Sequence, residues 1–164
     1  MGHSLHADSG AVPELIIRPS TEADCTYLST RLRQADQDEV RAVRDVPFEE
    51  VLLDGLRASD APLTACLDGA PVCMFGVVPR ETYGVIWLLG TDAISSVPVT
   101  FVRESRDWVG IFLDRYKLLT NVVDERNEAS IAWLKWLGCE FVQRFPEYGQ
   151  AKLPFLQFVR SADV

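Results

Sequence analysis

The spacing of apolar positions changes several times along this chain. Between residues 20 and 58, apolar residues recur three and four positions apart, which is the period of an amphipathic helix. Between residues 63 and 89 they gather in short runs separated by turn residues, which predicts strands. After Pro98 the helical period returns, and the rest of the chain alternates between apolar runs and helical stretches.

The N-terminal third predicts one strand followed by three helices. Residues 14–18 form a short apolar strand closed by Pro19. The segment Ser20-Thr-Glu-Ala-Asp24 has the character of a helix start with a capping box, so a helix is expected from there to about Gln34. Two further helices are expected, over residues 36–44 and after Pro47.

The middle of the chain predicts three strands and a long helix. Residues 63–67 and 71–78 flank an Asp-Gly turn and predict a β-hairpin, and residues 85–89 predict a third strand that ends at Gly90. A helix of about five turns is then expected, with Ser95, Ser96 and Pro98 as its start signal. Its expected inner face comprises Val102, Ser105, Val109, Phe112 and Tyr116.

The C-terminal part predicts a strand, a capped helix and two more strands. The run over residues 118–123 has the apolar content of a buried strand. Asn127 is a good N-cap, and Gly138 is a typical helix stop. The expected inner face of the helix between them comprises Ile131, Leu134 and Leu137. Strands are expected to begin at Cys139 and to cover residues 152–159.

This order of elements predicts one α/β (α+β) domain over residues 13–164. A mixed, mostly antiparallel sheet of six to seven strands with helices on both faces is the natural architecture. The polar residues 1–12, with His3 and His6, are expected to form a flexible N-terminal arm, and they lack the apolar segment of a signal peptide.

Composition excludes several classes of partner. The net charge of −8 disfavours nucleic acid, whose binding requires basic residues. Cys25, Cys66, Cys73 and Cys139 are widely separated, so we expect free thiols in a reducing cytoplasm and no metal site. No apolar run approaches the roughly 20 residues of a membrane span.

The predicted element order resembles that of the GNAT N-acetyltransferase fold over roughly residues 15–158. The segment from Asn121 to Phe141 resembles the C-terminal half of that fold, in which an Asn-initiated helix follows the strand that opens an acyl-CoA cleft. The resemblance implies acetyl-CoA as a possible cofactor.

The resemblance also implies positions for the cofactor. The strand end formed by Leu88, Leu89, Gly90 and Thr91 would pair with the pantetheine arm. Arg103 and Arg106 could contact phosphates from the first turns of the long helix, or be solvated or paired with acids. Asn127 matches the Asn that contacts the cofactor arm, although a plain N-cap explains it, and Ser130 lies near the same helix start.

Two departures from the GNAT pattern bear on catalysis. GNAT enzymes usually carry Gln/Arg-x-x-Gly-x-Gly/Ala before the long helix, whereas residues 91–100 contain no glycine to let phosphate approach the backbone. Many of these enzymes place a Tyr four residues before the terminal Gly as the acid for the thiolate, and here that position is Leu134.

Asp36 and Glu39 are the candidates for an acceptor site. At three residues apart on a helix, both carboxylates lie on one face, where they could bind an amine or act as its base through water. The residue types favour a solvated acidic face on an acidic chain over this catalytic interpretation. Arg33 could pair with Asp36.

A narrower resemblance is to the internal virion protein A family of T7-like tailed phages. It is carried by Arg33-x-x-Asp36-x-x-Glu39, Phe75-Gly-Val, Trp87-Leu-Leu-Gly-Thr-Asp92, Phe101-x-Arg-x-x-Arg106, the segment 121–138 and Pro154-Phe-x-x-Phe158. It implies a phage protein that acts in virion assembly with weak or no catalysis. Its partners would be phage or host proteins, and its location the host cytoplasm or the virion. The alternatives are an active acetyl-CoA-dependent N-acetyltransferase acting on a protein or small amine, and an acyl-CoA sensor.

Overall fold

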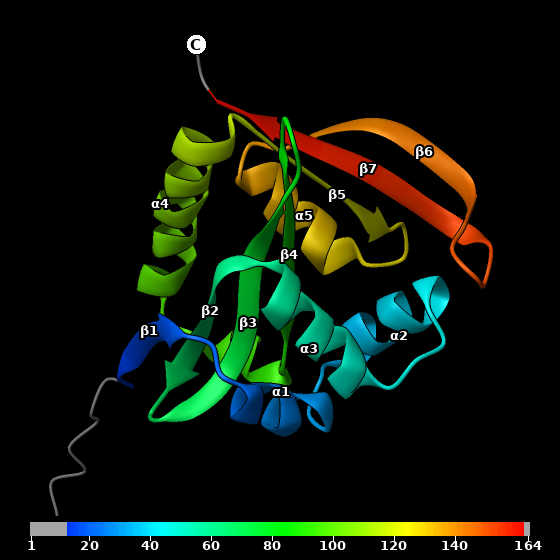
Figure 1. Ribbon diagram of the computed structural model, residues 1–164. Helices are drawn as coiled ribbons and strands as arrows, with labels where there is room; N and C mark the ends of the chain where they lie inside the picture. Colours follow the sequence, from blue (N-terminus) through cyan, green and yellow to red (C-terminus); the bar gives the residue numbers. More distant parts are fainter. Residues whose placement is uncertain (1–12, 163–164) are drawn as a thin grey trace, which may run out of the picture.

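A seven-stranded mixed sheet forms the centre of the molecule (Figure 1). The computed structural model describes residues 13–162, so the predicted arm over residues 1–12, with His3 and His6, lies outside the described residues. The strand order is β1-β2-β3-β4-β5-β7-β6, and every neighbouring pair is antiparallel except β4 and β5. The strands are β1 (Leu15–Pro19), β2 (Asp60–Leu67), β3 (Ala70–Pro79), β4 (Gly84–Gly90), β5 (Leu118–Asp124), β6 (Glu140–Tyr148) and β7 (Leu153–Ser161).

Helices cover both faces of the sheet, which confirms the predicted architecture. The helices are α1 (Glu22–Ser29), α2 (Gln34–Val43), α3 (Phe48–Ala58), the 3₁₀ turn η1 (Asp92–Ser96), α4 (Val99–Tyr116) and α5 (Glu128–Trp136). On one face, Leu28 of α1 and Leu52 of α3 pack on Met74 of β3. On the other face, Val109 of α4 packs with Leu119 of β5. Each face therefore has its own apolar core.

The segment between α1 and α2 differs from the predicted long helix. Thr21 caps α1 and forms the predicted capping box with Asp24. The helix ends at Ser29 instead of continuing to about Gln34, and α2 begins at Gln34. The expectation was wrong because the intervening residues cross the end of β4. Leu32 forms a bridge with Thr91, and the backbone N–H of Arg33 donates to the carbonyl of Gly90.

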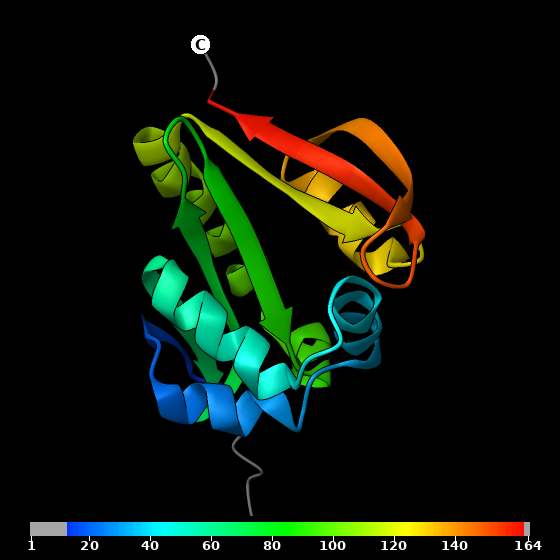
Figure 2. The ribbon, with the colours of Figure 1, turned by 45° about the vertical axis from the view of Figure 1, so that its right-hand side comes forward.

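Strands β4 and β5 pair at one end and then separate, as Figure 2 shows. Their parallel register contains only the pairs Gly84 with Leu119 and Val85 with Thr120. At the next position, the side-chain amide of Asn121 donates to the carbonyl of Ile86 over 2.7 Å. A side chain thus spans the widening gap where a backbone hydrogen bond would otherwise continue the ladder.

Helix α5 is capped as predicted, but its inner face is only partly buried. The side chain of Asn127 accepts a hydrogen bond from the N–H of Ser130. Leu137 is buried, whereas Ile131 and Leu134 are half-buried. These two positions remain half-buried because α5 lies beside the separating strands, where Leu134 faces a cavity.

The four cysteines are free thiols, as predicted. Cys25, Cys66 and Cys73 are buried, and Cys139 is half-buried. Burial raises the pKa of the Cys73 thiol to about 12. Within residues 13–162, no cluster of three or more His, Cys, Asp or Glu side chains could hold a metal ion. No helix in the same range has the length and apolarity required to cross a bilayer.

Candidate functional site

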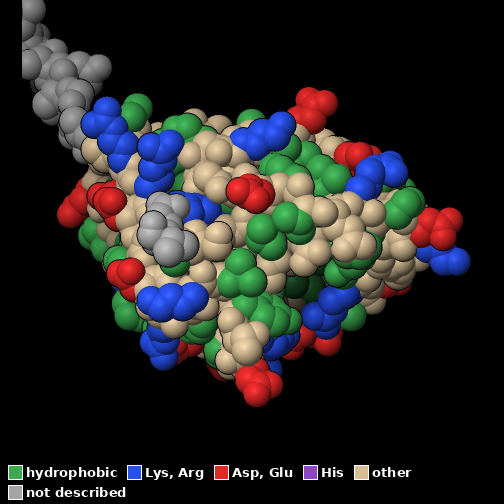
Figure 3. Space-filling view, turned by 90° about the horizontal axis from the view of Figure 1, so that it is seen from above, with side chains coloured by type: hydrophobic (Ala, Val, Ile, Leu, Met, Phe, Trp, Pro, Cys, Tyr) green, Lys and Arg blue, Asp and Glu red, His purple; other side chains and the backbone are tan. Residues whose placement is uncertain are grey.

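The gap between β4 and β5 opens into a cavity on the face covered by α2 and α3. This cavity, named here the α2-side cavity, has a volume of about 430 Å³. Carboxylates enter it from α2 and α3, and Trp87, Leu88 and Asn121 form the part nearest the sheet. Guanidinium groups enter it from the segments flanking α2 and from the end of β3, at Arg33, Arg44 and Arg80. Seen from above, the surface shows hydrophobic side chains gathered around a hollow (Figure 3). A cleft that combines an apolar wall with a few converging charges has the general character of a ligand site.

Asp36 connects the start of α2 to the end of β4. Its side chain is 1 % exposed, and its carboxylate accepts a hydrogen bond from the N–H of Gly90 over 2.8 Å. Its other oxygen lies 2.9 Å from Nε of Arg33, which confirms the expected ion pair. Burial raises the pKa of Asp36, and the contacts with Arg33 and Gly90 oppose that rise.

Glu39, one turn further along α2, reaches the start of the α5 region. One carboxylate oxygen accepts from the N–H of Asp124 over 2.9 Å, and the other accepts from the side-chain amide of Asn127 over 3.2 Å. Burial raises the pKa of Glu39 to about 7, against the lowering effect of these two hydrogen bonds. A carboxylate that exchanges protons near neutral pH has the property required of a general base.

The prediction of a solvated acidic face on α2 was wrong. Asp36 and Glu39 do share one face of the helix, as the spacing required, but that face points into the molecule. Asp36 is bound to β4 and Glu39 to the segment after β5. Helix α2 therefore spans the wide end of the gap between the two strands.

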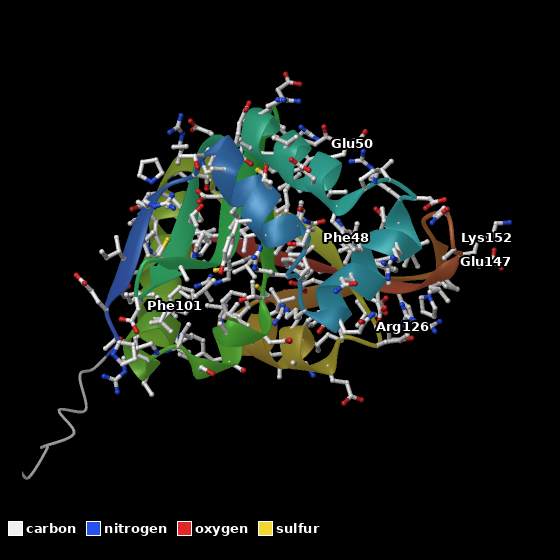
Figure 4. The ribbon with its side chains drawn as sticks, turned by 90° about the horizontal axis from the view of Figure 1, so that it is seen from below. Phe48, Glu50, Phe101, Arg126, Glu147 and Lys152 are labelled. Atoms are coloured by element: carbon white, nitrogen blue, oxygen red, sulfur yellow. The ribbon has the colours of Figure 1, made fainter. Side chains whose placement is uncertain are left out.

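The turn between β6 and β7 holds the other end of α2. The backbone N–H groups of Gln150 and Ala151 donate to the carbonyls of Val43 and Ala42, and the side-chain amide of Gln150 donates to the carbonyl of Arg41. These bonds satisfy carbonyls that the end of a helix leaves without partners. Figure 4 shows Glu147 and Lys152 pointing outward from this hairpin, next to α2.

A second, smaller opening lies on the opposite face, between the starts of α4 and α5. This mouth cavity has a volume of about 150 Å³, and Val97, Val102 and Trp133 form much of its wall. Arg33 lines both this cavity and the α2-side cavity, and its guanidinium donates to the hydroxyl of Ser130 over 3.3 Å. The two helix starts contribute partial positive charge here in a chain of net charge −8, whereas the charge of Arg33 is offset by its ion pair with Asp36.

A third cavity, of about 90 Å³, lies deeper between α4 and α5. This apolar cavity shares Phe101 and Trp133 with the mouth cavity, and Trp87, Leu88 and Leu134 with the α2-side cavity. Figure 4 labels Phe101, which reaches inward from the first turn of α4. The three cavities therefore meet where β4 and β5 separate, with Trp133 common to all of them.

The backbone of Leu88 faces the gap in the sheet. The carbonyl of Ile86 accepts from Asn121, and the N–H and carbonyl of Gly90 are bound to Asp36 and Arg33, so both residues direct these groups away from β3. Because backbone groups alternate along a strand, Leu88 directs its N–H and carbonyl to the same side. That side is the gap, since pairing with β5 ends at Val85.

The remaining predicted cofactor residues lie at different distances from the cavities. Leu89 lines the α2-side cavity, and Thr91 is buried, with its hydroxyl accepting from the N–H of Ala93. Arg103 is exposed on the second turn of α4. Arg106 lies over the ring of Trp136 and donates to its backbone carbonyl over 2.9 Å. Neither arginine lines any of the three cavities described above.

Sequence reasoning missed three residues at this junction. Arg33 was expected only to pair with Asp36, and Asn121 and Trp133 were given no role. An asparagine inside an otherwise apolar strand was the available signal for Asn121, since an amide is rarely buried without a partner. Nothing local marks Trp133, which reaches all three cavities only through the packing of α5 beside the gap.

The chain is similar in structure to several solved acetyltransferases. The chain is similar to an acetyltransferase of the GNAT family from Streptococcus pneumoniae, with 16% sequence identity and a TM-score of 0.59, covering 92% of this chain and 100% of that chain. It is also similar to AAC(6')-Ib in complex with ribostamycin and coenzyme A, with 16% identity and a TM-score of 0.65, covering 90% and 93%. A third is the ribosomal-protein-S18-alanine N-acetyltransferase from Escherichia coli, with 12% identity and a TM-score of 0.62, covering 92% and 96%.

These comparisons establish a GNAT acetyltransferase fold for the chain, as its predicted element order indicated. No protein-family model matches the sequence, and no curated protein matches it. None of the comparisons supports the resemblance to phage internal virion proteins, which rests on the quoted sequence phrases alone.

Proposed function

We propose that this chain is an N-acyltransferase that takes an acyl group from a CoA thioester, such as acetyl-CoA, and transfers it to an amine of a protein or small molecule. The observation that carries the proposal is the gap between β4 and β5, which joins cavities on opposite faces of the sheet. Such a passage lets a thioester and an amine reach the same point from two sides. Proximity of this kind supplies much of the rate enhancement in acyl transfer.

In this proposal the thioester carbonyl lies beside the backbone N–H of Leu88. That N–H faces the gap, and a fixed donor of this kind stabilises the negative charge that develops on the carbonyl oxygen. The backbone of Gly90 is already bound to Asp36 and Arg33. Leu89, Gly90 and Thr91 therefore set the position of the strand end, and Leu88 makes the catalytic contact.

The mouth cavity would hold the polar part of the cofactor. Arg33 and Ser130 present a guanidinium and a hydroxyl there, and Asn127 starts the adjacent helix. Arg103, exposed on α4, can meet a phosphate outside the mouth. Arg106 contributes by holding α4 to the end of α5 through Trp136. Positive side chains would thus replace the glycine-rich turn, whose place is taken by residues 91–100.

Glu39 would act as the base for the acceptor amine, through water. It lines the α2-side cavity, and burial raises its pKa to about 7. Asp36 lies deeper and is fully occupied by Gly90 and Arg33, so it would position the strand end without exchanging protons. The position of the usual thiolate acid holds Leu134, so the departing thiolate would take its proton from water.

Titration with acetyl-CoA tests the proposal, with ADP as a control for non-specific anion binding. A ligand that binds only the folded chain raises its stability by RT ln(1 + [L]/Kd), so saturating acetyl-CoA should raise the Tm by several degrees. Release of free thiol in the presence of an amine panel then measures turnover. An unchanged Tm at millimolar acetyl-CoA would overturn the proposal.

A second candidate is a protein of this fold that acts by binding during virion assembly, without turnover. It rests on the sequence phrases shared with the phage family, on the glycine-free segment 91–100 and on Leu134. The same titration separates the candidates. No cofactor binding favours the assembly role, whereas binding without thiol release across a broad amine panel favours an acyl-CoA sensor.

A further inference from the structure

The apolar cavity between α4 and α5 has a chemistry different from that of its two neighbours. Ser105 carries the only hydroxyl in its lining, and that hydroxyl already donates to the carbonyl of Val102 within α4. The rest of the wall is aliphatic or aromatic, and includes Phe112, Leu134 and Leu137. Water is disfavoured in such a space, because a buried water requires two to four polar partners.

The apolar cavity continues inward from the mouth cavity, where the cofactor is proposed to enter. The mouth cavity lies at the first turns of α4 and α5, whereas the apolar cavity extends along α4 to Phe112 and along α5 to Leu137. From Phe101 to Phe112 an α-helix rises roughly 16 Å. A thioester that enters at the mouth and presents its carbonyl to Leu88 therefore has this cavity directly beyond its reactive carbon.

Two other occupants of the cavity are disfavoured on physical grounds. The pantetheine arm carries amide groups, and burying an amide without hydrogen-bond partners is unfavourable. The acceptor amine would enter from the opposite face, where Glu39 and Asp36 line the α2-side cavity. An alkyl chain attached to the thioester carbonyl fits the cavity in both respects, because it is apolar and would extend from the carbonyl into this space.

We propose that the apolar cavity is an acyl-chain site, and that the preferred donor is a straight-chain acyl-CoA longer than acetyl-CoA. This inference rests on the proposed acyl-transfer function. The volume of about 90 Å³ sets the length of the chain. It is smaller than an apolar cavity of about 150 Å³ that accommodates benzene, so the site takes a chain of only a few carbons.

The transfer balances without a further co-reactant. The amine nitrogen attacks the thioester carbonyl carbon, the new N–C bond forms and the C–S bond breaks. The amine loses one proton through water to the carboxylate of Glu39, which passes that proton back to water, and the CoA thiolate takes one proton from water. The products are an amide with the longer acyl chain and free CoA thiol.

A chain-length series tests the acyl-chain site without need of an acceptor. The Kd values of CoA, acetyl-, propionyl-, butyryl-, hexanoyl- and decanoyl-CoA are measured by calorimetry on the full chain. Each buried methylene contributes about 0.8 kcal/mol, so affinity should rise about fourfold per added carbon until the cavity is full, and then level off or fall. Acetyl-CoA binding with a flat or falling series would overturn the acyl-chain site and leave the proposed function standing. No binding of any thioester, or of CoA itself, would overturn both.

Three variants test whether the acyl chain binds within this cavity. Ser105→Leu fills the space from α4 and should abolish the gain from propionyl- to hexanoyl-CoA. Ser105→Ala removes the hydroxyl without adding volume and should keep the full series. Phe112→Leu enlarges the far end and should move the optimum to a longer chain. If Ser105→Leu folds and retains the chain-length dependence of the parent chain, the acyl chain lies elsewhere and the inference fails. If Ser105→Leu does not fold, an optimum unmoved in Phe112→Leu overturns it equally.

Discussion

The two faces of the split sheet differ in how their side chains are used. On the α2 face, the charged groups at the gap already bind one another and the backbone, as with Asp36 on Gly90 and Glu39 on Asp124. On the α4–α5 face, Arg33 and Ser130 lie at the mouth, and the side chains deeper in the same gap are almost all apolar and enclose a cavity. The contacts on the α2 face therefore hold the two halves of the sheet in position. The α4–α5 face instead encloses an open cavity beside the same gap.

This difference shows that the wide end of the gap is held by a helix and not by the sheet. Backbone pairing between β4 and β5 ends at Val85. Beyond that point, contacts from α2 fix the ends of both strands and reach the β6–β7 turn. Substitutions that remove contacts of α2 should therefore alter the geometry of the cleft more than substitutions of similar size on the α4–α5 face.

Asp36→Ala should give the largest effect, because it removes the carboxylate shared by Arg33 and Gly90. Deleting one partner of a buried ion pair costs about 3–5 kcal/mol in free energy of unfolding, and the lower end is expected since the Arg33 side chain is 19 % exposed. Chemical denaturation measures the loss. Acetyl-CoA affinity should also fall, because the end of β4 is released.

Asp38→Ala provides the control on the same helix. Asp38 is exposed, and its carboxylate accepts only a solvent-exposed hydrogen bond from the side chain of Gln34. Removing this carboxylate should lower the free energy of unfolding by less than about 1 kcal/mol. Equal losses for the two variants would mean that the buried contacts of Asp36 do not hold the strand end.

Gly149→Ala should separate the β6–β7 turn from α2, with the next largest effect. Gly149 has φ of +69°, and a Cβ atom there would collide with the carbonyl oxygen of Ala42. Gly69→Ala is the matched control, because Gly69 has φ of +82° and no atom within 4 Å of a Cβ atom. Both variants incur about 1–2 kcal/mol of left-handed strain, so the larger loss of Gly149→Ala in denaturation reports the contact with α2. Similar losses would show that the turn does not support the helix.

Much of the fold follows from short-range patterns. The seven strands, the capping box at Thr21, the cap at Asn127 and the two-sided cover of helices were all indicated by period and turn chemistry. The end of α1 was not, because residues 30–33 have no strong stop signal. Their conformation is set by contacts with Gly90 and Thr91, nearly sixty positions along the chain.

The candidate site was less accessible from the sequence. The spacing of Asp36 and Glu39 correctly placed both on one face of a helix, but a charge pattern does not reveal which way that face points. Their partners, Gly90, Asp124 and Asn127, lie 54 to 88 positions away. Leu134 shows the same limitation for apolar residues. Its helical spacing predicted a core position, but in the structure Leu134 and its neighbours line a cavity.

Glu39→Gln gives the smallest expected effect, and one that depends on pH. Burial raises the pKa of Glu39 from an ordinary value of 4.5 to about 7 in the folded chain, despite the hydrogen bonds from Asp124 and Asn127. A raised folded-state pKa contributes stability that is fully present below the unfolded value and is lost as pH rises through about 7. Glutamine does not titrate, so the stability of the parent chain relative to Glu39→Gln should decline by about 1–2 kcal/mol between pH 4.5 and 8.

Two readouts distinguish a structural Glu39 from a base. Denaturation at several pH values measures the decline in stability. If Glu39 accepts the proton of the amine, kcat/KM of the parent chain should also rise through pH 7, because only the carboxylate form is competent. The same limb should vanish in Glu39→Gln. A stability difference with an unchanged rate profile would assign Glu39 to holding α2 against β5, and the α2 face would then be scaffold throughout.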